Sequence, residues 1–274
     1  MSLIKAKRPH KPDLMSVETV YDLYAEYYDS TTARHVEDLP MYQQITMIKS
    51  PPYLEVGCGT GRVLEYLLSH KHNSVKGQYL FGVDISDGML SLSKEKIGSF
   101  IDKGFVRIKN HDFVREKLND QKFHAAFVTY YTFNYIDKDL QNIFLENIRK
   151  ALHPGGIIVL DFWCPELFSH PEKTNQWTDY RTIILGNRHI RFQQRLNMVT
   201  PNHEKRDWIF TESDGKTKKI ITNRLYTSPQ TGKTLLETAG FIDVLRVFNY
   251  ALPGRSNFAE IPQSTNFVLL AKNP

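Results

Sequence analysis

Three glycines within five residues constrain this chain more than any other feature. Gly57, Gly59 and Gly61 are separated by single residues and follow the short apolar segment 53–56. A pattern with helical spacing begins directly afterwards. Glycine suits such a turn because it lacks a Cβ, which would block positive φ angles and the close approach of a ligand. An apolar strand, a glycine turn and a helix in this order predict a nucleotide-like ligand at the helix N-terminus.

The spacing of the glycines separates this motif from the dinucleotide fingerprint. In G-x-G-x-x-G the third glycine would stand one residue later, where this chain has Arg62, and Glu55 precedes the loop. The pattern E-x-G-x-G-x-G resembles the first motif of class I S-adenosylmethionine-dependent methyltransferases. A tight strand–helix turn without a ligand is the alternative. The resemblance implies S-adenosyl-L-methionine as the cofactor, bound through Glu55, Gly57, Cys58, Gly59 and Gly61.

An acidic residue ends the next apolar segment. Asp84 closes the segment 79–84, roughly 20 residues beyond the glycines, where a carboxylate can accept both ribose hydroxyls of an adenosine. The alternative is a helix cap, since another helical pattern begins at this point. Ser86 or Asp87 can serve as that cap, which leaves Asp84 free for the ribose.

A third predicted strand, 105–109, leads to further candidates for the adenine. The family places an acid after this strand, hydrogen-bonded to the adenine amino group, with an apolar neighbour on the ring. The resemblance therefore implies these roles for Asp112 and Phe113. It also places Ile85 and Met89 beside the adenine, although packing explains them nearly as well. We interpret His111 as a loop residue with local bonds and leave it out of the site.

The tyrosine-rich segment 17–29 has the spacing of an amphipathic helix, and packing on the core explains most of its tyrosines. Its end, Tyr27-Tyr28-Asp29, resembles the Y-D element that precedes the first motif in many small-molecule methyltransferases. There, the tyrosine closes over the methionine end of the cofactor. Tyr28 is thus a candidate for cofactor binding, with plain packing as the alternative. A tyrosine ring excludes water and can face a sulfonium cation.

A fourth buried strand begins at Phe123 and leads into a stretch of hydroxyls and aromatic rings. Ligands of open α/β sheets bind at the carboxyl ends of the strands, so this stretch is expected at the reacting centre. Thr129 and Tyr130 are candidates for cofactor binding. If the reaction uses a general base, Tyr135 or Tyr28 is the candidate. We find no metal-ligand spacing, serine triad or paired catalytic carboxylates.

The order of the segments predicts an α/β fold: a Rossmann-like, seven-stranded, mostly parallel sheet with flanking helices. A fifth strand is expected at 157–162. Period-two strands between 183 and 226 predict an antiparallel β insertion, whose polar face (Arg191, Gln193 and Arg195) either binds an anionic or hydroxyl-rich substrate or is simply solvated. We expect a basic flexible tail at 1–16, a helical lid at 17–52, the cofactor-binding core at 53–163, the insertion over the substrate site at 164–227 and completion of the core at 228–274.

Within the superfamily, the Y-Y-D element, the hairpin insertion and a W-x-P-E-x-F turn resemble sugar N,N-dimethyltransferases. The turn consists of Trp163, Pro165, Glu166 and Phe168. That subfamily has a histidine after the fourth strand, where this chain has Tyr135, which puts a carried-over base in doubt. The expected function is methyl transfer to nitrogen or oxygen of a small molecule. An RNA or protein methyltransferase and a non-catalytic S-adenosylmethionine-binding module are the alternatives.

Composition and charge limit the cellular location and the partners that we expect for this protein. The 274 residues carry a formal net charge of +5, with the basic residues mostly scattered, so nucleic acid is disfavoured as a partner. The two cysteines, Cys58 and Cys164, predict no disulfide framework and fit a reducing cytoplasm. No apolar run approaches the ~20 residues of a membrane span. We therefore expect a cytoplasmic protein without membrane contact, acting on a small-molecule methyl acceptor. The sequence leaves open whether the protein forms a homodimer.

Overall fold

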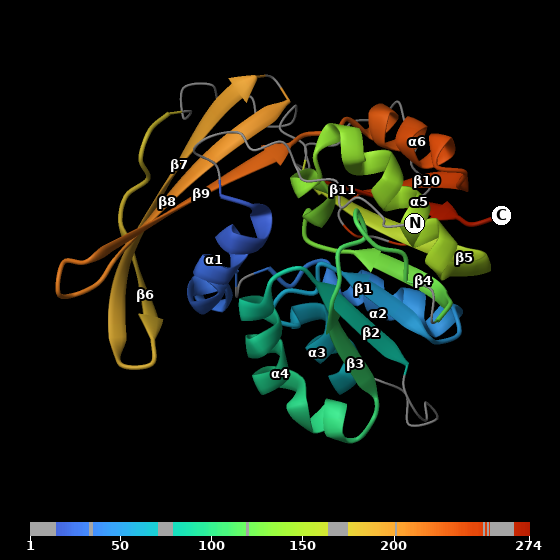
Figure 1. Cartoon of the computed structure of the whole chain (residues 1–274), viewed down its shortest axis with the longest axis horizontal. Helices are drawn as coiled ribbons and strands as arrows, with labels where there is room; N and C mark the ends of the chain where they lie inside the picture. The colour runs from blue at the N-terminus through green and yellow to red at the C-terminus, as the bar shows by residue number, and fades with distance from the viewer. Residues whose placement is uncertain are drawn as a thin grey trace, which may run out of the picture.

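The computed structural model describes residues 15–32, 35–70, 79–118, 121–163, 175–200, 202–248, 250, 252 and 266–274. Most of the expected basic tail, together with Cys164, Pro165, Glu166 and Phe168, lies outside these ranges. The described chain forms two sheets with helices around and between them (Figure 1). None of the helices within these ranges combines the length and apolar character needed to span a membrane.

The larger sheet has seven strands in the order β10-β11-β5-β4-β1-β2-β3. Its central strands are parallel, and β11 runs antiparallel to both of its neighbours. This is the mostly parallel α/β sheet that the sequence predicts. The strands are β1 (Tyr53–Val56), β2 (Leu80–Asp84), β3 (Val106–Asn110), β4 (Phe123–Val128), β5 (Leu152–Trp163), β10 (Ile242–Phe248) and β11 (Asn266–Lys272).

Helices cover both faces of this sheet. On one face, α2 (Leu39–Ile48), α3 (Arg62–Ser69) and α4 (Asp87–Asp102) pack on the sheet. On the other, α5 (Gln141–Ala151) and α6 (Pro229–Thr238) build a second apolar cluster. Because both faces are covered, the central strands are mainly apolar instead of alternating between apolar and polar residues. The short 3₁₀ helices η1 (Thr132–Tyr135) and η2 (Lys138–Leu140) connect β4 to α5.

The strand β5 begins earlier than the sequence predicts. We expected it at 157–162, after a turn at Pro154 and Gly155, but α5 passes directly into the strand at Leu152. The pairing with β4 shifts register after Phe123, so the chain bulges where Pro154 and Gly155 stand. A proline and a glycine with φ of 74° suit an irregular stretch of strand as well as a turn.

The predicted insertion is a separate four-stranded antiparallel sheet. The helix α1 (Val17–Thr32) lies between the two sheets (Figure 1). Tyr24 stacks on Trp208 with ring centroids 4.6 Å apart, and Tyr27 stacks on Phe210 at 3.9 Å. The packing role expected for most tyrosines of this helix is confirmed. The strands are β6 (Arg181–Leu185), β7 (Arg188–Thr200), β8 (His203–Thr211) and β9 (Thr217–Leu225).

The polar residues proposed on β7 lie on the other face of the insertion. Phe192 packs in the cluster with α1, and side chains alternate along a strand, so Arg191, Gln193 and Arg195 point away from α1. Arg195 pairs with Asp207 at 2.6 Å. Of the two alternatives left open for this face, the structure therefore supports the one in which it does not receive the substrate. The alternation was read correctly, but the sequence did not show which face meets the rest of the protein.

Candidate active site

A hollow of about 940 Å³, part of it open to solvent, lies at the carboxyl edge of the parallel strands. The glycine loop, the ends of β2, β3 and β4, and helix α1 all contribute to its wall. Among the residues predicted for the site, Gly61 is the exception that does not line it. Those that do are Tyr28, Glu55, Gly57, Cys58, Gly59, Asp84, Ile85, Met89, Asp112, Phe113, Thr129, Tyr130 and Tyr135.

Each glycine of the loop meets a different neighbour. Gly57, Gly59 and Gly61 have φ of 72°, 53° and 83°, a backbone region that residues other than glycine rarely adopt. A Cβ on Gly57 would lie 2.4 Å from Thr132 Oγ1, and one on Gly61 would lie 2.6 Å from Ser93 Oγ. At Gly59 the nearest atom would be 4.0 Å away, so this residue faces open space. Gly61 therefore serves packing, whereas Gly59 leaves room for a ligand.

The carboxylate of Asp84 is held against the glycine loop. Its Oδ2 accepts a hydrogen bond from the backbone N–H of Gly59 at 2.8 Å, and Oδ1 accepts one from Ser86 N–H at 2.9 Å. Burial raises the pKa of Asp84, and these backbone donors act against that rise. Ser86 Oγ accepts from Met89 N–H and caps α4, as the sequence allows. Asp84 is thus not free: it also holds the loop in place.

Glu55 is a buried carboxyl with one unused oxygen. Its Oε1 accepts a hydrogen bond from Thr129 Oγ1 at 2.9 Å, while Oε2 has no hydrogen-bond partner in the described part of the chain. Burial raises the pKa of Glu55 to about 8. A buried orphan oxygen on a cavity wall is a site for a donor that arrives with a ligand.

The part of the wall that follows β3 combines an acid, an apolar ring and a histidine. Asp112 Oδ1 accepts from Val114 N–H at 2.8 Å, and Phe113 is buried. His111, which the sequence analysis left out, is buried beside Phe113 with ring centroids 4.7 Å apart. Neither of its ring nitrogens has a hydrogen-bond partner among the described residues, and burial lowers its pKa. The sequence signal that could have identified His111 as a wall residue is its position directly after the end of a strand.

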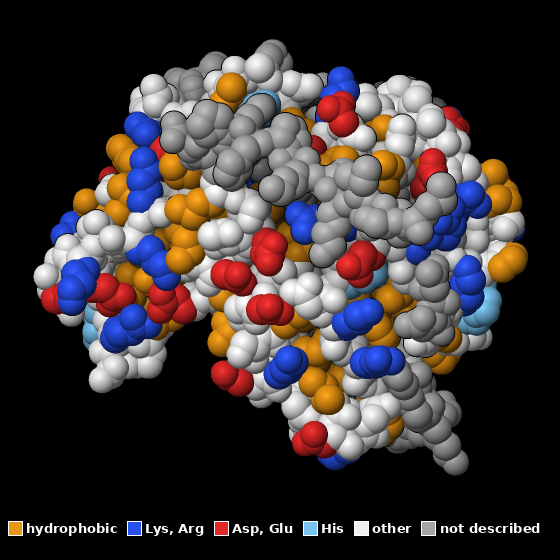
Figure 2. Space-filling model, in the orientation of Figure 1, with side chains coloured by type: hydrophobic (Ala, Val, Ile, Leu, Met, Phe, Trp, Pro, Cys, Tyr) orange, Lys and Arg blue, Asp and Glu red, His pale blue; other side chains and the backbone are white. Residues whose placement is uncertain are grey.

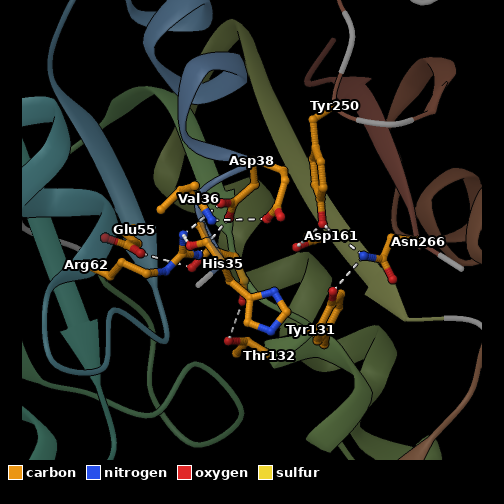
Figure 3. A network of polar contacts seen from close by, with 12 residues as sticks. His35, Val36, Asp38, Glu55, Arg62, Tyr131, Thr132, Asp161, Tyr250 and Asn266 are labelled. Carbon is orange, nitrogen blue, oxygen red and sulfur yellow. Dashed lines mark hydrogen bonds and ion pairs between the residues drawn. The ribbon is translucent and has the colours of Figure 1, made fainter. Parts of the chain in front are cut away.

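Polar contacts of Thr60 and Arg62 tie the N-terminal segment to the glycine loop and the start of α3. Thr60 Oγ1 donates to Asp29 Oδ1 at 2.5 Å, at the end of α1. Arg62 donates to both oxygens of Asp38, at 2.7 and 2.6 Å, and to the carbonyl of His35 (Figure 3). Arg62 also lines the hollow. This position was not predicted from the sequence, although the residue stands in place of a glycine in the motif. The arrangement supports the expected helical lid.

A strained turn after β4 places the next part of the wall. Tyr130 and Tyr131 have φ of 47° and 64°, which is uncommon for bulky residues and costs roughly 1–3 kcal/mol each. Asn266 Nδ2 donates to Tyr131 OH at 2.7 Å, and Tyr250 OH donates to the buried Asp161 at 3.2 Å (Figure 3). The turn sends Tyr130 into the hollow and Tyr131 into this network.

Comparison with known proteins places this site in a family. The family described as a methyltransferase domain matches residues 54–158, which include the glycine loop and the carboxyl ends of the strands that follow it. Residues 54–158 therefore form a methyltransferase domain of the class I S-adenosylmethionine-dependent kind. S-adenosyl-L-methionine is the cofactor of this family, as the glycine motif implied.

Solved structures share the fold of this methyltransferase over most of its length. The CcbJ methyltransferase from Streptomyces caelestis matches with a TM-score of 0.73 at 20% identity, over 92% of this chain and 97% of that one. CalS10, an amino pentose methyltransferase from Micromonospora echinaspora, matches with a TM-score of 0.64 at 17% identity, over 97% and 100%. At these identities the likeness shows the fold.

The curated relatives match a shorter part of the methyltransferase. Carboxy-S-adenosyl-L-methionine synthase 1 of Yersinia pseudotuberculosis is 28% identical over 113 residues, which are 40% of this chain and 44% of that protein. The corresponding synthase of Hydrogenovibrio crunogenus is 26% identical over 106 residues, 39% and 40% of the two chains. The chain thus spans less than half the length of the curated relatives that it matches.

Proposed function

We propose that this methyltransferase transfers a methyl group from S-adenosyl-L-methionine to nitrogen or oxygen of a small molecule by direct in-line displacement. The observation that carries the proposal is the convergence of Gly59, Glu55 and Asp84 on one hollow that α1 covers. Gly59 leaves space where a Cβ would intrude, and Glu55 offers an oxygen without a partner. The residues present therefore fit the cofactor.

Different parts of the wall suit different parts of the cofactor. We assign Asp84 to the ribose hydroxyls. Its oxygens can accept hydrogen bonds from these hydroxyls through the lone pairs that the bonds from the backbone leave unused. We assign Glu55 Oε2 to the ammonium of the methionine part. Asp112 is assigned to the adenine amino group, with Phe113 and Met89 on the ring. Ile85, Cys58 and Thr129 complete the wall.

Another part of the wall is aromatic and is assigned to the methyl acceptor. Tyr21, Tyr28, Tyr130 and Tyr135 line the hollow, and the rings of Tyr21 and Tyr135 meet edge-on with centroids 5.4 Å apart. The bound cofactor supplies a methyl group on a sulfonium. The chain aligns the acceptor with it and excludes water, effects worth up to ~7–11 kcal/mol of barrier in favourable cases. Tyr135 is the candidate to accept a proton from the acceptor.

Methyl transfer is tested by following S-adenosylhomocysteine by mass spectrometry with a panel of small amines and alcohols. We expect product only when a suitable acceptor is present. Tyr135→Phe should lower kcat by roughly 10²–10⁴-fold if its hydroxyl acts as the base, with unchanged cofactor affinity. Unchanged kcat in this variant would exclude Tyr135 as the base. Cofactor binding without transfer to any acceptor would favour a non-catalytic module instead.

Cofactor binding is expected to release a proton from Glu55. With a pKa raised to about 8 by burial, Glu55 is mostly protonated at about pH 7 before binding. An ammonium beside Oε2 favours the charged form and lowers this pKa, so binding releases most of one proton. Above about pH 9 the carboxyl is already ionised and the release disappears. Calorimetry in buffers of different ionisation enthalpy measures it, and Glu55→Gln should abolish it.

The surface does not favour a polyanionic substrate. Figure 2 shows Lys and Arg side chains interspersed with Asp and Glu over the visible face rather than gathered in one stripe. Nucleic-acid binding proteins instead collect basic residues along one face. Strong, salt-dependent binding of RNA would overturn this preference for a small molecule.

A further inference from the structure

The inner face of the insertion carries charged residues that the sequence analysis did not single out. Trp208 and Ile220 pair across β8 and β9 and pack in the cluster with α1. The next pairs on the same face are Arg206 with Thr222, and Glu204 with Arg224. These four residues, which we name the inner polar cluster (Glu204, Arg206, Thr222, Arg224), therefore follow the apolar contact with α1.

Arg224 is the member that contacts the wall of the hollow. Its guanidinium donates through Nε to Tyr135 OH at 2.7 Å and lies 5.3 Å from the centroid of the Tyr135 ring. The side chain is 8% exposed. Within the described part of the chain, no carboxylate lies within 4 Å of it. The carboxylate of Glu204 acts on this guanidinium electrostatically from the neighbouring strand, but it does not form an ion pair with it. A buried guanidinium without an ion pair of its own is costly, which marks a site for an anion.

The other members leave this charge uncompensated. Glu204 Oε1 accepts from Arg206 Nε at 2.5 Å, so the one acid of the cluster is already engaged by the other arginine. Two guanidinium groups and one carboxylate leave a single net positive charge. Glu204 Oε2 and Thr222 Oγ1 are buried and have no hydrogen-bond partner among the residues that the structure describes. The cluster thus combines a net positive charge with a buried hydroxyl that has no partner.

The positive charge reaches the hollow itself. Tyr130 lines the hollow, and burial raises its pKa to about 12. The charges of Arg224 and Arg206 act against that rise, because both favour the ionised phenol. Two members of the cluster therefore lie within electrostatic reach of Tyr130 on the wall of the hollow.

We propose that the methyl acceptor carries a carboxylate, held by Arg224 and Arg206 with Thr222 Oγ1 as an additional donor. This inference rests on the proposed function, since it names the substrate class of the same site. A carboxylate supplies the single negative charge that the cluster lacks, and its two oxygens match the planar donor fork of arginine. The substrates expected are small amines or alcohols that bear a carboxylic acid.

The test compares acids with their uncharged primary amides. Benzoate, hippurate and glucuronate are titrated against benzamide, hippuramide and glucuronamide, into the full chain with and without S-adenosylhomocysteine. We expect at least one acid to bind roughly tenfold or more tightly than its amide, as charged hydrogen bonds in buried sites do. The acid should also shift the ¹⁵Nε signal of Arg224, assigned with Arg224→Lys, whereas the amide should not.

Two variants show whether Arg224 causes the preference. Arg224→Met should remove the difference between acid and amide, while Arg191→Met should keep it. Arg191 is the matched control because it is an exposed arginine on the outer face, 3.9 Å from the ring centroid of Tyr180. Acids that bind no better than amides would overturn the proposal, as would a preference that survives Arg224→Met. Failure to bind S-adenosylhomocysteine contradicts only the proposed function, because the acid preference is also read without it.

Discussion

Replacing Gly59 with valine abolishes measurable binding of S-adenosylhomocysteine. Gly59 has φ of 53° and its missing Cβ faces open space beside Tyr28, whose ring carbon Cε1 would be 4.0 Å away. A valine side chain at this position enters the volume assigned to the cofactor. The branched side chain also strains the backbone, at a cost of roughly 1–2 kcal/mol in this region of φ. We expect the dissociation constant to rise at least ~100-fold, equivalent to ~2.7 kcal/mol.

Calorimetry measures this loss, and thermal unfolding separates it from misfolding. The matched control is Gly98→Ala, because Gly98 lies in α4 and a Cβ there would meet no atom within 4 Å. This control should bind like the parent and be slightly more stable, since alanine favours a helix over glycine. A folded Gly59→Val protein with parental affinity would show that the loop does not face the ligand.

Asp84→Ala is expected to weaken cofactor binding by about 3 kcal/mol, through lost hydrogen bonds to the ribose hydroxyls. The same change removes the acceptor of Gly59 N–H, so the glycine loop also loses a support. Asp87→Ala serves as the control: Asp87 is a neighbouring, exposed acid outside the hollow that accepts from Asn110 Nδ2. Calorimetry should show the loss for the first variant alone.

An analogue separates the two effects of Asp84→Ala. S-(2′-deoxyadenosyl)homocysteine lacks one of the hydroxyls assigned to Asp84. It should bind the parent more weakly than S-adenosylhomocysteine does, and Asp84→Ala should bind both ligands alike. If the variant still discriminates between them as the parent does, Asp84 acts only on the loop and the ribose assignment is wrong.

Local features of the sequence were sufficient to predict the sheet and most of the site. The glycine spacing and the acids at strand ends depend on backbone geometry, which is encoded by neighbouring residues. Because the ends of parallel strands meet at one edge, placing Asp84 and Asp112 after their strands also placed them together. Their predicted positions on the wall of the hollow are confirmed, whereas their roles toward the cofactor stay predictions.

Features that depend on contacts between distant segments were not predictable in this way. The inner face of the insertion is set by the packing of Phe192 and Trp208 on α1, about which period-two alternation says nothing. For the same reason Arg224 went unnoticed, since its partner Tyr135 is far away in sequence. Arg62 was visible as a departure from a motif, but its partner Asp38 is the residue just before α2, far from the motif in sequence.

We infer that the glycine loop, Glu55 and Asp84 hold the cofactor in one hollow beside an aromatic acceptor wall. A crystal structure with S-adenosylhomocysteine bound tests it most directly. We expect the ribose hydroxyls to contact Asp84, the ammonium to contact Glu55 Oε2 and the sulfur to face Tyr28 and Tyr135. A ligand bound elsewhere, or one whose ribose and ammonium contact neither carboxylate, would contradict it.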